Sequence, residues 1–373
     1  MYRLSLAVMI AVGLALCASV GSQARATGWA GVEIAWRNDP RPAADAPVPV
    51  EPPQSRRSTR RALRRGQRRV EIESIQEPTT PSTPPAAAMP AAVAPPDVPA
   101  IAAAAHTIVH RDQSYGSDPG QRFDLHLPDG CSGGGLPLIV WIHGPDWRTG
   151  SRGECPVVWL AEQGFAVASI DYRTSDDAVF PAQLDDCRAA IHAICSEATT
   201  WGIDPTRICV AGMGAGGHLA ALVAFTAPEE RPIREASTDE PDDDVAAVAL
   251  FDAPTHLPSL GAAHDRAGSA ESRLVGGPLP EFREAAQKAS PLVHVSADDP
   301  PALIVQGSLG DGVAVEQGER LDAALRAAGV ESALVVLDSR AAAVAPRRDT
   351  PAGGAFVEFL DRTVGPAAAR FEN

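Results

Sequence analysis

Blocks of apolar residues alternate with amphipathic blocks from residue 106 almost to the end of the chain. The apolar blocks are short and rich in β-branched residues, whereas the amphipathic blocks repeat apolar residues at helical spacing. Strands that are buried on both faces read as continuous apolar runs, so this alternation predicts an α/β fold with a mainly parallel sheet covered by helices on both faces. The expected strands are residues 107–110, 122–127, 138–143, 165–171, 208–211, 245–251, 302–305 and 333–337. The expected helices are residues 157–163, 180–200, 218–223, 315–328 and 355–364.

The first 26 residues have the pattern of a secretory signal peptide. A short basic start precedes an apolar run, and small residues follow up to Ala24-Arg25-Ala26, a suitable cleavage site. An uncleaved membrane anchor is the alternative, but the apolar run is short for spanning a bilayer. We therefore expect a secreted or periplasmic protein with no transmembrane span after removal of the signal.

Residues 27–105 have the composition of a disordered linker. They are rich in proline and alanine and lack sustained apolar periodicity, so they cannot bury a core. Between Arg56 and Arg69, within the basic stretch 55–69, arginine doublets recur every four residues. This stretch is either a solvated linker or an arm that docks on an anionic surface or an acidic partner. The third segment, residues 106–373, is the expected folded domain.

Charge and cysteine content narrow the function classes. Residues 106–373 contain 20 Lys+Arg and 39 Asp+Glu, which excludes a nucleic-acid-binding body. No metal-ligand spacing, phosphate loop or convincing dinucleotide fingerprint is present, so no metal or cofactor is expected. Export permits disulfides, and Cys155 with Cys187 is the favoured pair, because each lies near the start of a helix flanking the same strand.

One glycine-rich corner joins an expected strand directly to a helix. It reads Gly212-Met213-Gly214-Ala215-Gly216. A nucleophile elbow has this strand–turn–helix context and the pattern Gly-x-Ser-x-Gly, in which the glycines permit a tight, strained turn. The glycine frame is therefore intact, and the serine is missing.

The order of elements and a set of motifs resemble the α/β-hydrolase family, and within it the hormone-sensitive-lipase-like and feruloyl-esterase-like carboxylesterases. The resemblance covers about residues 106–366. The motifs that carry it are His-Gly-Pro-Asp-Trp at 143–147, Ala-Ser-Ile-Asp-Tyr-Arg at 168–173, Phe-Pro-Ala-Gln at 180–183, Trp-Gly-Ile-Asp-Pro-Thr-Arg at 201–207, Gly-Gly-His-Leu-Ala at 216–220, Ala-Ser-Pro at 289–291 and Asp-Asp-Pro-Pro at 298–301.

The resemblance implies a serine, an acid and a histidine in that chain order. The nucleophile position is Gly214. The acid position is Gly310, with Asp311 one residue late, and the histidine position is Ala342. The nine histidines are at 106, 110, 126, 143, 192, 218, 256, 264 and 294, so none follows the seventh expected strand, where this fold places its base.

The loop that would bind the oxyanion is altered as well. The family offers glycine N–H groups here, and the equivalent positions are Gly144, Pro145 and Asp146, together with Ala215 after the corner. Pro145 has no N–H, and Asp146 brings negative charge towards a developing oxyanion. Because each such donor contributes about 3 kcal/mol to the transition state, the change opposes acyl transfer.

Three functional hypotheses follow. The first is a non-catalytic pseudoenzyme that binds a ligand, with an ester or glycan suggested by the resemblance, or a partner. The second is an active ester hydrolase with relocated chemistry, for which the groups near the corner are His143, Asp146, Asp311 and His218, each of which also has a structural interpretation. The third is a scaffold that docks through its arginine-rich arm.

Overall fold

The computed structural model describes residues 107–130, 135–226, 244–309, 313–340 and 344–365. All of these belong to one of the two compact units of the chain. The expected signal peptide, linker and arginine-rich stretch lie outside the described residues, and so do Cys131, Gly310, Asp311 and Ala342.

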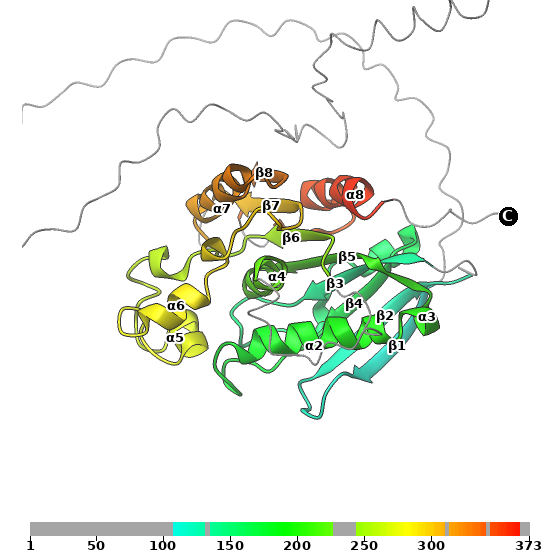
Figure 1. Cartoon of the computed structure of the whole chain (residues 1–373), viewed down its shortest axis with the longest axis horizontal. Coiled ribbons are helices and arrows are strands. Elements are labelled where there is room, and N and C mark those ends of the chain that lie inside the picture. Colours follow the sequence, from blue (N-terminus) through cyan, green and yellow to red (C-terminus); the bar gives the residue numbers. More distant parts are fainter. Residues whose placement is uncertain (1–106, 131–134, 227–243, 310–312, 341–343, 366–373) are drawn as a thin grey trace, which may run out of the picture. The chain divides into compact units, whose positions relative to one another are not determined.

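The core of this unit is an eight-stranded sheet with the order β1-β2-β4-β3-β5-β6-β7-β8 (Figure 1). Strands β1 and β2 pair antiparallel, as do β2 and β4, and every later neighbour pairs parallel. The predicted mainly parallel sheet is therefore confirmed. Its strands are β1 (Thr107–Ser114), β2 (Arg122–Pro128), β3 (Leu136–Ile142), β4 (Ala166–Ile170), β5 (Ile203–Met213), β6 (Ala247–Phe251), β7 (Ala302–Gly307) and β8 (Ser332–Leu337).

Helices cover both faces of the sheet. Successive strand residues point to opposite sides, and the apolar side chains on each side pack against helices. Leu138 and Val140 of β3 belong to one apolar cluster together with residues of the helices α2 (Ala182–Ser196), α4 (Ala215–Phe225) and α7 (Val315–Ala328). Ile139 and Trp141 of the same strand belong to a second cluster together with residues of the 3-10 helix η2 (Val158–Gln163) and helix α8 (Pro351–Thr363). Two buried cores thus hold β3 and β5 rigidly at the centre of the sheet.

Shorter elements complete the connections. They are η1 (Arg152–Glu154), α3 (Ala198–Trp201), η4 (Leu257–Ser259), α5 (Ala270–Val275), α6 (Arg283–Lys288) and η5 (Pro291–Val293). The expected helix at 157–163 is a 3-10 helix, and the expected helix at 180–200 is divided into α2 and α3. The helix expected at 315–328 has those bounds in the structure.

The predicted disulfide is wrong. Cys155 and Cys187 are both free thiols. Cys187 lies in the apolar cluster of α2, whereas Cys155 packs against the cluster on the other face of the sheet. The crossovers before and after β4 lie on opposite faces, so proximity to the same strand does not bring the two sulfurs together.

Two kinds of feature are absent from the described residues. No group of three or more His, Cys, Asp or Glu side chains in this part of the chain is arranged to hold a metal ion. None of the helices that the structure describes has both the length and the apolar content needed to cross a membrane.

Candidate functional site

The glycine-rich corner lies at the carboxyl edge of the sheet, where β5 ends and α4 begins. Gly214 has φ 56° and ψ −120°, a conformation that side-chain-bearing residues rarely adopt. Its N–H donates to the carbonyl of Phe251 at 2.9 Å, and its own carbonyl accepts from the N–H of His218 at 3.0 Å. The backbone is therefore that of a strand–turn–helix elbow, with glycine where the nucleophile would be.

The flanking glycines are required by the close approach of strand and helix. A Cβ on Gly212 would lie 2.3 Å from the backbone carbon of Gly216. A Cβ on Gly216 would lie 2.0 Å from the carbonyl oxygen of Ile142. Neither position has room for a methyl group, so the frame of the motif is maintained by packing, whatever the chemistry above it.

The loop after β3 closes over this corner. The Ala215 N–H, which follows the nucleophile position, donates to the carbonyl oxygen of Pro145 at 3.1 Å. A Cβ on Gly214 would lie 3.0 Å from the same oxygen. The amide that an elbow offers to an oxyanion is thus already bonded to a carbonyl of the protein, and the space for a nucleophile is restricted by that carbonyl.

Trp147 anchors the same loop to helix α4. Its side chain is buried, and its indole Nε1–H donates to Nδ1 of His218 at 3.1 Å. Nε2 of His218 lies 2.6 Å from the carbonyl oxygen of Ala289. Both imidazole nitrogens are engaged, and burial lowers the pKa of His218 to about 4, so this side chain is neutral and structural at pH 7.

Asp146 is held by its own turn. Its Oδ1 accepts hydrogen bonds from Thr149 Oγ1 at 2.7 Å, Thr149 N at 2.8 Å and Arg148 N at 3.2 Å. Burial opposes ionisation, but these bonds outweigh it and lower the pKa of Asp146 below its ordinary value. The carboxylate therefore adds negative charge beside the corner, as the sequence indicates.

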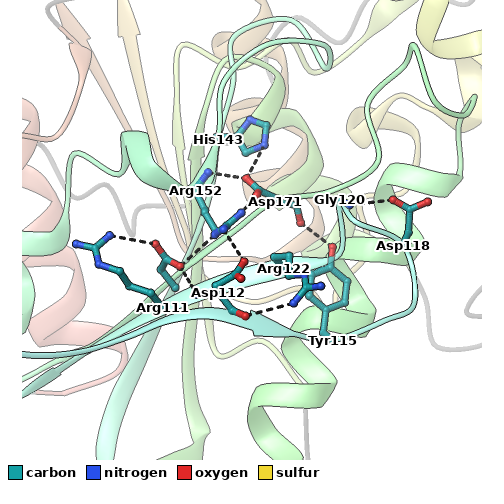
Figure 2. A network of polar contacts seen from close by, with 10 residues as sticks. Arg111, Asp112, Tyr115, Asp118, Gly120, Arg122, His143, Arg152 and Asp171 are labelled. Carbon is teal, nitrogen blue, oxygen red and sulfur yellow. Dashed lines mark hydrogen bonds and ion pairs between the residues drawn. The ribbon is translucent and has the colours of Figure 1, made fainter.

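His143 belongs to a polar network beside the corner, shown in Figure 2. Its ring stacks on Tyr172 with centroids 4.4 Å apart, and its Nε2 lies 3.7 Å from Oδ1 of Asp171. Burial lowers the pKa of His143, and the Asp171 carboxylate offsets part of that effect. A buried, stacked imidazole of this kind is positioned by its surroundings and does not reach Gly214 through any hydrogen bond within the described residues.

Arg152 is the centre of that network (Figure 2). Its guanidinium pairs with Asp112 at 2.8 Å, with Asp124 at 3.0 Å and with Asp171. Its backbone N–H also donates to Oδ1 of Asp171 at 2.6 Å. The two ends of the loop, His143 and Arg152, are therefore both fastened to Asp171, the residue that follows β4.

The relocated-chemistry hypothesis requires a hydroxyl or thiol beside a histidine. Ser259 Oγ lies 2.9 Å from Nδ1 of His256, but the hydroxyl donates to the carbonyl of His256 and accepts from Gln317 at 3.0 Å. Ser196 lies 3.4 Å from His192 at the end of α2, which leads to the start of β5 and therefore to the opposite edge of the sheet. Both contacts are local helix-end hydrogen bonds.

Ser308 and three of the four described thiols offer no better nucleophile. Ser308 Oγ donates to Asp338 at 3.2 Å. Burial raises the pKa of Cys155 to about 12 and also raises the pKa of Cys187 and of Cys209. Such thiols stay protonated and unreactive at pH 7.

The sequence singled out Gly214, Pro145, Asp146, His143 and His218, and the structure places these residues in or beside one corner. It describes neither Gly310 and Asp311 nor Ala342, so the acid and base positions remain predictions. Sequence reasoning missed two groups. Arg152 was not distinguished from other arginines, and the buried Asp252 that follows β6 was not noticed, although an acid directly after an apolar strand is a usable signal.

Comparison with known proteins agrees with this architecture. Esterase LipC of Mycobacterium tuberculosis (strain ATCC 25618 / H37Rv) is 30% identical over 234 residues, covering 59% of this chain and 56% of LipC. The isoprenylcysteine alpha-carbonyl methylesterase ICME of Arabidopsis thaliana is 26% identical over 242 residues, covering 62% of this chain and 56% of ICME. The chain thus spans only about half the length of these curated relatives.

Among solved structures, a truncated carbohydrate esterase from gut microbiota superposes with a TM-score of 0.54 and 25% identity, covering 62% of this chain and 88% of that one. Esterase Est2 of Thermogutta terrifontis superposes with a TM-score of 0.55 and 23% identity, covering 72% and 95%. The second likeness shows the fold alone. Residues 123–325, more than half of the chain, match the BD-FAE family. The chain therefore belongs to the BD-FAE family and has the α/β-hydrolase fold.

Proposed function

We propose that this chain keeps the esterase fold without ester hydrolysis, as a pseudoenzyme that acts by binding a ligand or a partner. The observation that carries the proposal is the hydrogen bond from the Ala215 N–H to the Pro145 carbonyl at 3.1 Å. A tetrahedral oxyanion needs that N–H as a donor. A carbonyl oxygen at the same place would repel the oxyanion.

The missing triad supports the same conclusion. Gly214 has no nucleophilic side chain, and the resemblance assigns Gly310 and Ala342 to the acid and base positions. The last histidine in the sequence is His294, before β7, so the segment after the seventh strand cannot supply an imidazole. Loss of a complete triad costs about six orders of magnitude in turnover.

The names of the relatives guide the choice of ligand. They include a carbohydrate esterase and an isoprenylcysteine methylesterase. We therefore propose that the ligand bears an ester or is a glycan. We also propose that the protein is exported, and is then either secreted or periplasmic. The arginine doublets between Arg56 and Arg69 would supply a second contact, with an anionic surface or an acidic partner.

The test is hydrolysis of short-chain chromogenic acyl esters by the complete chain, with a fluorophosphonate probe in parallel and an active carboxylesterase as positive control. We expect neither turnover nor labelling. Robust turnover by the natural chain would refute the proposal, and a Ser308→Ala variant would then show whether that hydroxyl is the nucleophile.

Two variants separate the missing nucleophile from the closed loop. The variant with Gly214→Ser, Gly310→Asp and Ala342→His but an unchanged loop should stay unlabelled, because the Cβ at position 214 would lie 3.0 Å from the Pro145 oxygen. A second variant adds Pro145→Gly and Asp146→Gly to the changes Gly214→Ser, Gly310→Asp and Ala342→His. Labelling of the second variant only is the expected result, and equal labelling of both would show that the loop does not block the site.

A further inference from the structure

A buried imidazole links the loop of residues 143–150 to helix α4. The His218 side chain is completely buried, and its ring meets the Trp147 indole edge to face with centroids 5.0 Å apart. Trp147 is two residues from Pro145, the residue whose carbonyl covers the corner. The position of the Pro145 carbonyl therefore depends on the contact between Trp147 and His218.

The partners of His218 determine where its proton lies. A carbonyl oxygen only accepts, so the 2.6 Å contact with Ala289 requires a proton on Nε2. An indole N–H only donates, so the 3.1 Å bond from Trp147 requires a bare Nδ1. The closed loop is thus compatible with one neutral tautomer of His218 and with no other protonation state.

A second proton on His218 would place an N–H on Nδ1, pointing at the N–H of Trp147. Two donors then face each other in a buried space, and the hydrogen bond is replaced by repulsion. We propose that protonation of His218 releases the loop of residues 143–150 from the Gly214 corner. Acid would then expose the Ala215 N–H and the surface beneath the loop, so the closure is a pH-operated plug.

No charged group among the described residues compensates a proton on His218. The loop, the elements packed against α4 and the segment around Ala289 carry several titratable or charged side chains, and each of them has a contact of its own with another group. These are His143, Asp146 and Arg148 of the loop, Asp252 after β6, Asp186 of α2, Lys288 of α6 and His294 after η5. The imidazolium would therefore lack a counter-ion in the closed state.

The direction of the pH effect follows from proton linkage. In the closed state burial lowers the pKa of His218 from 6.5 to about 4. Once Trp147 leaves, water reaches the ring and the pKa returns towards 6.5, so the open state binds more protons than the closed state. Opening is therefore favoured as pH falls, by about 80-fold between pH 6.5 and pH 4, and the total effect reaches about 300-fold at the plateau below pH 4.

Hydrogen exchange of the complete chain measures this directly. The amides of Ala215 and Ser175 donate to the loop carbonyls of Pro145 and Trp147, so they report on closure. Val210 in the centre of β5 reports on global unfolding. After correction for intrinsic rates, protection of Ala215 and Ser175 should fall about 80-fold between pH 6.5 and pH 4. Val210 should stay protected.

Two variants distinguish His218 from the other imidazole of this region. His218→Gln offers Ala289 a donor and cannot titrate, so the pH dependence at Ala215 should disappear. His143→Gln is the matched control, and there the pH dependence should persist. Constant protection at Ala215 in the natural chain, parallel loss at Val210, or a pH dependence that disappears with His143 would each overturn the proposal.

The comparison within the natural chain needs no variant, so the test survives if His218→Gln fails to fold. The proposal also does not depend on the absence of hydrolysis. A plug that opens in acid is compatible with either outcome of the esterase assay.

Discussion

The turn beneath the Gly214 corner and the loop above it differ in what they retain of an esterase. The turn keeps Gly212 and Gly216, whose hydrogens contact backbone atoms, and it keeps the strained φ of Gly214. The loop keeps its length and its anchors but presents a carbonyl oxygen where the family presents N–H groups. Packing therefore maintains the backbone of the elbow independently of the reaction, while the loop above it differs in the groups that it presents to the corner.

The largest effect is expected from a change in the turn itself. Alanine normally stabilises a helix by about 1 kcal/mol relative to glycine. Gly216→Ala should instead destabilise the protein by about 3 kcal/mol or more, because backbone oxygens meet the new methyl group. Thermal or denaturant unfolding measures the difference.

Gly153→Ala is the matched control for that substitution. A Cβ on Gly153 would lie 3.5 Å from Ser151 Oγ, an ordinary contact. Its free energy of unfolding should change by less than about 0.5 kcal/mol. A Gly216→Ala protein as stable as this control would show that the turn can relax and that packing does not preserve it.

An intermediate effect on stability is expected from the ion pairs of Arg152, which hold one end of the loop. Arg152→Met leaves the buried Asp124 carboxylate and that of Asp171 without their shared guanidinium. We expect a loss of about 2 to 3 kcal/mol in the free energy of unfolding, read from the urea midpoint.

Arg111 offers a control on the same carboxylate. It pairs with Asp124 at 3.6 Å and its side chain is 71% exposed, so Arg111→Met should cost less than about 0.5 kcal/mol. Equal losses in the two variants would mean that the network does not depend on the central position of Arg152.

The smallest effect is expected on the outside of the loop. Asp176 pairs with Arg148 at 2.6 Å and with Arg273 at 3.4 Å, and all three side chains are about half exposed. Asp176→Asn should lower the melting temperature by less than about 2 °C, and high salt should abolish the difference. A larger, salt-independent loss would show that the loop is held mainly by its surface ion pairs and not by its buried contacts.

The sequence predicts the fold of this protein much better than the geometry of its corner. Buried parallel strands and the long amphipathic α7 produce strong periodic patterns, so their positions were predicted closely. The pairing of Cys155 with Cys187 was wrong, because a sequence does not state on which face of a sheet each crossover lies. The sequence predicts that Pro145 lacks an N–H donor. The hydrogen bond from the Ala215 N–H to the Pro145 carbonyl, however, depends on three-dimensional packing that no residue pattern encodes.

The Pro145 carbonyl also imposes an order on any mutational path between this chain and an active esterase. A serine at position 214 that arrives first meets that oxygen and gains no oxyanion donor, so it is a cost without a benefit. A change that moves the carbonyl of residue 145 away from the corner before the serine arrives would leave the Ala215 N–H available as a donor. The effects of the two steps are therefore expected to be non-additive. Under selection for activity, the serine would therefore be favoured only after the loop has changed.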